Sequence, residues 1–163
     1  MSPFLHERYT KITAAKSDAQ QHILSSSASS DHVSQVMKIL HIEDSMPGKV
    51  LVREWLRRDP ENNTIYHVTQ VDKVGDALTE LHENHYDLVL ADLHLPDSYG
   101  IETVTALRQA SPDTPIIIHT GTQDIKLLEQ AMQYGVCRIP KGNEEAGTFG
   151  HKLKDALLNG CAV

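Results

Sequence analysis

The chain has 163 residues, of which 40% are hydrophobic, and this size and composition suit one domain with a single core. Its formal charge of −7 argues against a nucleic-acid-binding surface, because contacts to phosphates require clustered Lys and Arg. The N-terminus lacks the uninterrupted apolar run of a signal peptide, and no stretch reaches membrane-spanning length, so we expect a soluble, cytoplasmic protein that makes no membrane contact. Cys137 and Cys161 show no metal-site or disulfide spacing and are expected to be reduced thiols.

Residues 1–36 are expected to form an N-terminal extension without net charge, so the negative charge falls in residues 37–163. Residues 25–30 are a Ser-rich, low-complexity stretch that is typical of a flexible linker. Before this linker, apolar residues at near-helical spacing predict one short, weakly amphipathic helix. Such a segment is either a loosely docked tail or a docking or dimerisation helix, which leaves a homodimer open.

Residues 37–163 alternate between apolar runs and helical periods. Five apolar runs predict strands at Lys38–Ile42, Ile65–Val71, Asp87–Ala91, Pro115–His119 and Val136–Pro140. The intervening segments predict five helices: one from near Pro47 to Asp59, one from an N-cap at Asp72 through Leu81, one carrying Ile101 to Leu107, one carrying Ile125 to Met132 and ending at Gly135, and one carrying Phe149 to Leu157. Gly147 and Gly150 weaken the first turns of the last helix.

The alternation of strands and helices implies a parallel sheet that is covered on both faces. The second run mixes polar and apolar residues and the fifth contains Arg138, whereas the first, third and fourth are largely apolar. Edge strands tolerate polar residues and central strands do not. We therefore predict the order 2-1-3-4-5, which is the flavodoxin-like, doubly wound α/β arrangement with five helices.

The carboxyl ends of these strands are expected to build one site from Glu43, Asp44, Asp92, Thr120 and Lys141. Three carboxylates so close together repel one another unless a cation joins them. Mg²⁺ suits such oxygen ligands and keeps positions open for substrate oxygens. A carboxylate beside it could attack phosphorus, while the metal, the lysine and the hydroxyl hold the phosphoryl oxygens.

Four motifs stand at the ends of the predicted strands: Ile42-Glu43-Asp44, Asp92-Leu93-His94-Leu95-Pro96-Asp97 with Gly100, His119-Thr120-Gly121 and Pro140-Lys141-Gly142. Through them, residues 37–160 resemble the receiver domain of two-component response regulators. Each motif alone is a weak signal, but their order and their positions at strand ends make the set specific.

The resemblance implies a role for each matching residue. Asp92 matches the phosphoacceptor, Asp44 the acid that binds Mg²⁺ directly, and Glu43 its neighbour, which often acts through water. The backbone carbonyl of His94 matches the third protein ligand. Thr120 matches the switch hydroxyl and Lys141 the lysine that pairs with the phosphoryl group. The imidazole of His94 either tunes the lifetime of the phosphoryl group, as this position does in the family, or is an exposed loop side chain without effect.

The sequence departs from the family pattern at Arg138, where an aromatic residue usually stands three residues before the lysine. That ring normally swings inward during switching, whereas an arginine keeps its charge in water. We hypothesise that the output face of this chain uses charge pairing around Arg138 instead of ring rotation.

The resemblance implies a receiver that takes a phosphoryl group from a phosphohistidine on a histidine kinase or a histidine phosphotransfer domain. It would then signal to an unidentified downstream protein by altered docking, or pass the phosphoryl group onward in a relay. Only five residues follow Leu158, so we expect no output domain in this chain. The alternative is a receiver-fold binding module that works without phosphorylation. A phosphohydrolase is a third reading, but His94 stands where such enzymes need a second acid, so we expect no enzyme beyond self-phosphorylation and self-dephosphorylation.

Overall fold

The computed structural model describes residues 35–59, 64–142 and 147–159. The helix predicted before residue 25 and the Ser-rich linker lie outside the described residues. The strands are β1 (Gln35–Ile42), β2 (Thr64–Val71), β3 (Leu88–Ala91), β4 (His94–Leu95), β5 (Ser98–Tyr99), β6 (Ile116–Thr120) and β7 (Cys137–Pro140). The helices are α2 (Met46–Arg57), α3 (Val74–Glu83), α4 (Ile101–Ala110), α5 (Ile125–Met132) and α6 (Phe149–Asn159).

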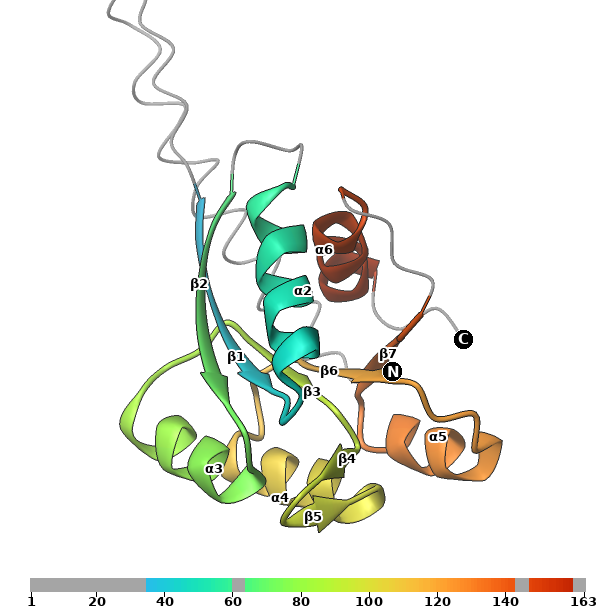
Figure 1. The fold of residues 1–163 in the computed structure, drawn as a ribbon. Helices are drawn as coiled ribbons and strands as arrows, with labels where there is room; N and C mark the ends of the chain where they lie inside the picture. Colours follow the sequence, from blue (N-terminus) through green and yellow to red (C-terminus); the bar gives the residue numbers. More distant parts are fainter. Residues whose placement is uncertain (1–34, 60–63, 143–146, 160–163) are drawn as a thin grey trace, which may run out of the picture.

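The main sheet has five parallel strands in the order β2-β1-β3-β6-β7, which confirms the predicted order 2-1-3-4-5. Helices α2 and α6 cover one face, and α3, α4 and α5 cover the other (Figure 1). Every residue of β3 and β6 is buried, whereas the edge strand β2 contains no fully buried residue. Apolar composition therefore sorted central from edge strands correctly.

Alternation along the strands divides the core into two halves. On β1, Leu40 and Ile42 pack under α3, α4 and α5, while Ile39 packs under α2 and α6. The first half is almost entirely aliphatic. The second contains the aromatic side chains of Trp55 and Phe149 as well.

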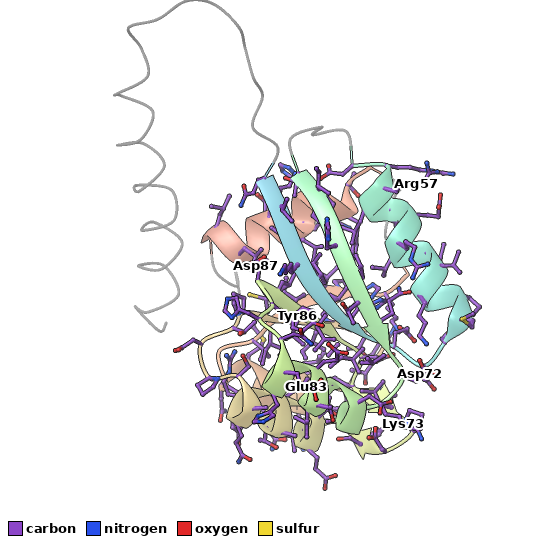
Figure 2. All side chains as sticks on the ribbon, turned by 90° about the vertical axis from the view of Figure 1, so that its left-hand side faces the viewer. Arg57, Asp72, Lys73, Glu83, Tyr86 and Asp87 are labelled. Atoms are coloured by element: carbon purple, nitrogen blue, oxygen red, sulfur yellow. The ribbon has the colours of Figure 1, made fainter. Side chains whose placement is uncertain are left out.

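The start of α3 differs from the prediction. Lys73, not Asp72, occupies the N-cap position, and it makes no side-chain capping bond. The carboxylate of Asp97 replaces the missing cap, because it accepts hydrogen bonds from the backbone N–H groups of Val74 and Gly75 at 2.9 Å each. Asp72 pairs with Lys49 on α2 instead. Figure 2 shows Asp72 beside Lys73 at the carboxyl end of β2, far from Arg57 at the end of α2.

The start of β1 and a hairpin after β3 also differ from the prediction. β1 starts at Gln35, so it extends back across the predicted boundary between residues 36 and 37. The hairpin of β4 and β5 was not predicted, although the Pro96-Asp97 pair between them is typical of a turn. It lies in the loop between β3 and α4.

Gly150 stands inside α6 because another part of the chain comes very close. A Cβ at this position would lie 2.5 Å from Oδ2 of Asp59. That carboxylate also accepts from the Tyr66 hydroxyl at 2.6 Å and from Lys154 Nζ at 2.8 Å. The glycine that weakens the helix thus makes room for a buried ion pair between the end of α2 and α6.

Cys137 contradicts the expectation of a reduced thiol, because it is disulfide-bonded. Its Sγ faces α6 and lies 3.6 Å from the carbonyl oxygen of Ala156. The other cysteine of the chain follows α6 in the sequence, and it lies outside the described residues. Among the described helices, none is long and apolar enough to cross a bilayer.

Candidate functional site

Side chains from three strand ends meet at the carboxyl edge of the sheet. Glu43 follows β1, Asp92 follows β3 and Lys141 follows β7. Lys141 Nζ lies 2.5 Å from Oε2 of Glu43 and 2.6 Å from Oδ2 of Asp92. One ammonium therefore bridges two carboxylates that are far apart in the sequence.

Asp92 is oriented by the backbone that follows it. Its Oδ1 accepts from the N–H groups of Leu93 at 2.6 Å and His94 at 3.3 Å. Burial raises the pKa of Asp92, but hydrogen bonding and attraction from Lys141, together with the Thr120 hydroxyl, outweigh burial and hold this pKa below its usual value. Burial likewise lowers the pKa of Lys141, and the bonds to Asp92 and Glu43 outweigh it and raise this pKa. The pair is ionised at neutral pH.

Glu43 is confined between the end of β1 and the first turn of α2. It is 1% exposed, and its Oε1 accepts from the Ser45 N–H at 3.1 Å. A Cβ at Gly48 would lie 2.8 Å from its Cδ, so a larger residue there would force this carboxylate to shift. The Ser45 hydroxyl caps α2 by accepting from the N–H of Gly48.

Asp44 and Thr120 complete the strand ends that the sequence singled out. Asp44 is exposed and adjoins Glu43 after β1. Thr120 is fully buried at the end of β6, and its carbonyl accepts from the Lys141 N–H at 3.0 Å. Its Oγ1 accepts from the N–H of Thr122 at 3.4 Å, so the hydroxyl is linked both to Asp92 and to the loop after β6.

His94 lies on the hairpin next to Asp92. Its Nδ1 is 3.8 Å from Oδ1 of Asp92, and its ring packs edge-on against Tyr99 with centroids 4.7 Å apart. The imidazole is exposed, and strand pairing between His94 and Tyr99 fixes its place at the rim of the site.

Arg138 is exposed on β7, and its guanidinium reaches the loop after β6. Nη2 donates to the carbonyl oxygen of Thr122 at 3.0 Å. The residue at this departure from the family pattern thus contacts the segment that begins at Thr120.

Two buried histidines that the sequence pattern did not single out lie beneath the site, His41 on β1 and His119 on β6. Burial lowers the pKa of His41 to about 3, with further lowering by His119 and Lys141, so this imidazole is neutral at neutral pH. His119 packs against Phe149 and Trp55 with centroid distances of 5.3 and 6.3 Å. A histidine at an inward position of an otherwise apolar strand was the signal that could have revealed both.

The donor set fits a hard divalent cation. Glu43 and Asp92 are buried carboxylates, Asp44 adds a third carboxylate at the same strand end, and Lys141 is the cation that contacts two of them. Oxygen ligands with this excess of negative charge are those that Mg²⁺ takes in proteins.

Comparison with known proteins identifies the fold and the sequence pattern. The sequence profile described as "Response regulator receiver domain" matches residues 39–141. The cell cycle transcriptional regulator CtrA of Caulobacter vibrioides is 34% identical over 89 residues, which are 55% of this chain and 36% of CtrA. The regulatory protein LuxO of Vibrio cholerae is 37% identical over 60 residues, which are 37% of this chain and 13% of LuxO. The matches thus span about a third of CtrA and about an eighth of LuxO.

Solved structures agree in fold. The isolated receiver domain of RcsB from Salmonella enterica serovar Typhimurium, solved with phosphomimetic BeF₃⁻, has a TM-score of 0.66 and 16% identity, with 79% of this chain and 93% of that chain covered. The phosphorylated cyanobacterial phytochrome response regulator RcpA has a TM-score of 0.63 and 19% identity, with 77% and 96% covered. At these identities the structures show the fold alone.

Proposed function

This chain belongs to the response regulator receiver domain family, and we propose that it is a phosphoacceptor whose phosphorylated residue is Asp92. The observation that carries the proposal is the contact of one lysine with two buried carboxylates at the carboxyl edge of the sheet. Lys141 Nζ lies 2.5 Å from Glu43 and 2.6 Å from Asp92. A lysine in a solvated turn, or an acidic pair elsewhere on the surface, would not make this contact with two carboxylates. It supports a pocket whose charges are arranged around an incoming phosphoryl group.

Glu43, Asp44, Asp92 and the backbone carbonyl of His94 would hold Mg²⁺. A bound divalent ion supplies positive charge beside the phosphoryl oxygens. The N–H groups of Leu93 and His94 hold Oδ1 of Asp92, which leaves Oδ2 and Lys141 at the open side of the carboxylate.

The transfer requires one bond to form and one to break. An oxygen of Asp92 attacks phosphorus, the bond between phosphorus and the imidazole nitrogen of the donor breaks, and the donor histidine keeps the electron pair. The Lys141 ammonium moves from the carboxylate to the phosphoryl oxygens, and the Thr120 hydroxyl donates to one of them. The product is an acyl phosphate on Asp92, and hydrolysis or onward transfer removes it.

A histidine kinase or a histidine phosphotransfer domain is the proposed donor. Exposed apolar side chains on the first turns of α2, namely Met46, Val50 and Leu51, lie next to the end of β1 that carries Glu43. Exposed apolar residues beside a reactive site favour docking of a protein partner. This supports a protein donor that docks on α2 and presents its phosphohistidine to Asp92.

Signal transmission would run through Thr120 and the loop that Arg138 holds. When Thr120 turns to the phosphoryl group, the loop that carries Thr122 has to follow, and the hydrogen bond from Arg138 to the Thr122 carbonyl links this movement to β7. We expect Arg138→Ala to change the affinity of a downstream partner for one phosphorylation state more than for the other. Equal affinity of parent and variant in both states would contradict this role.

The test of the phosphoacceptor is intact-protein mass after incubation with Mg²⁺ and acetyl phosphate. We expect a phosphate-sized mass gain in the parent, none with EDTA in place of Mg²⁺, and none in Asp92→Asn. No gain in a folded parent, with a donor that labels another receiver, would contradict the proposal and favour the phosphorylation-independent binding module. Partner binding that survives Asp92→Asn unchanged would point the same way.

A further inference from the structure

Three buried side chains with metal-binding atoms face one another on the α2 and α6 side of the sheet. His41, Glu43 and His119 are 1%, 1% and 3% exposed. One ligand atom from each lies within 4.8 Å of the other two. The neighbours of the two histidines on this face of β1 and β6, Ile39 and Ile117, are aliphatic. Two imidazoles therefore lie beside aliphatic side chains in this half of the core.

We propose that His41, Glu43 and His119 bind a divalent transition-metal ion such as Zn²⁺, in a site distinct from that of Mg²⁺. Two imidazole nitrogens and one carboxylate oxygen suit zinc and cobalt, whereas Mg²⁺ takes oxygen ligands. The candidate ligand atoms lie within 4.8 Å of one another, so one ion can reach all three when these side chains move closer together. Three protein ligands leave one coordination position open.

Gln70 acts as a positioning residue for this site. Its amide nitrogen lies 3.1 Å from Nδ1 of His41 and donates to the carbonyl oxygen of Lys49 at 2.9 Å, while its Oε1 accepts from Arg53 Nη2 at 2.7 Å. These bonds make Nδ1 of His41 an acceptor in this structure. A metal ion at Nε2 therefore requires the Gln70 amide to turn, with loss of its bonds to Arg53 and Lys49, so that its oxygen accepts from Nδ1–H. A hydrogen-bond acceptor behind a metal-bound histidine orients the ring and makes it a better ligand.

The ion would share Glu43 with the phosphorylation site. Oε2 of Glu43 pairs with Lys141, so a metal at the histidines competes with this ammonium for the carboxylate. One consequence rests on the proposed function: Zn²⁺ in the buried site draws Glu43 away from Lys141 and slows labelling by acetyl phosphate, even with Mg²⁺ in excess.

The first experiment titrates Co²⁺ into the full chain after treatment with EDTA and follows the visible absorption of the metal. We expect one Co²⁺ per chain at this site. We expect His119→Gln and His41→Gln to weaken binding by more than the roughly 10–100-fold that loss of an outer-shell partner costs. His67→Gln removes an exposed imidazole on β2 and is the matched control, with unchanged affinity. The proposal would be overturned if the parent binds no Co²⁺. It would also be overturned if folded His119→Gln and His41→Gln bind Co²⁺ with the same affinity as the parent.

Two further variants test the site without removing a ligand. Lys141→Met removes the competitor for Glu43, and Gln70→Glu places a stronger acceptor behind His41, so both are expected to tighten Co²⁺ binding. Unchanged or weaker binding in both would overturn the proposal even if the histidine variants failed to fold. Because Co²⁺ binding needs no phosphodonor, a parent that binds Co²⁺ but is not labelled refutes only the phosphoacceptor function. A labelled parent that binds no Co²⁺ refutes only the metal site.

Discussion

The two faces of the sheet are built differently. Under α3, α4 and α5 the buried core consists of aliphatic side chains and Tyr86. Under α2 and α6 the buried set also includes titratable residues, among them His41, His119 and Asp59. The same five strands thus provide one face that serves packing and one face that positions charge, and the candidate site stands at the end of the second. Changes on the first face should alter stability alone, and changes on the second should alter both.

The largest expected loss of stability follows from breaking the buried ion pair between α2 and α6. Lys154→Met leaves the Asp59 carboxylate, whose side chain is 3% exposed, without its ammonium partner. Loss of one partner of a buried pair costs about 3–5 kcal/mol. Chemical denaturation measures this cost. The double variant Asp59→Leu with Lys154→Met should recover most of the loss, and equal loss in both variants would show that the charge pair is not the cause.

The aliphatic face should respond to truncation without loss of chemistry. Leu107 on α4 is fully buried among aliphatic side chains, so Leu107→Ala is expected to cost about 2–5 kcal/mol of unfolding free energy. At a temperature where the variant is still folded, its rate of labelling by acetyl phosphate should equal that of the parent. A strongly reduced rate in the folded variant would mean that the two faces are coupled.

The buried imidazole of His41 predicts acid sensitivity in the presence of EDTA. The pKa of His41 is about 3 in the folded state and 6.5 in the unfolded chain. Between these two pH values the unfolded state binds a proton that the folded state does not bind. Stability therefore falls as pH drops below 6.5, by about 1.4 kcal/mol per pH unit and about 2 kcal/mol at pH 5. Denaturation at several pH values should show a shallower acid slope for His41→Gln. His82→Gln, on the exposed face of α3, is the matched control; a parent-like slope in His41→Gln would refute the assignment.

The smallest effect on stability, with a clear effect on chemistry, is expected for Gly48→Ala. The added Cβ would lie 2.8 Å from Cδ of Glu43, so the carboxylate must shift. A displacement of this size at a reacting site can slow labelling by up to about 100-fold. Gly75→Ala, whose Cβ would meet Asp97 at an ordinary 3.5 Å, is the control in the first turn of α3. Equal labelling rates for both variants would show that the position of Glu43 does not matter.

The fold and the main site residues could be predicted because they depend on local signals. Apolar runs gave the strand order, and the ends of these runs placed Glu43, Asp92 and Lys141 in one site. The cap of α3 could not be predicted, because Asp97 reaches it only through the hairpin after β3. Proximity of His41 to His119 depends on strands that are not sequential. Contacts made by the tertiary fold leave no trace in local spacing.

The most direct test of the central claim, that the polar face positions Asp92 for phosphorylation, is chemical trapping of the acyl phosphate. Borohydride reduces an acyl phosphate to an alcohol and leaves an ordinary carboxylate intact. After labelling with acetyl phosphate and Mg²⁺, peptide mass analysis should find homoserine at position 92 and unchanged residues at Glu43 and Asp44. Homoserine at another acidic position, or none in a labelled chain, would contradict the account.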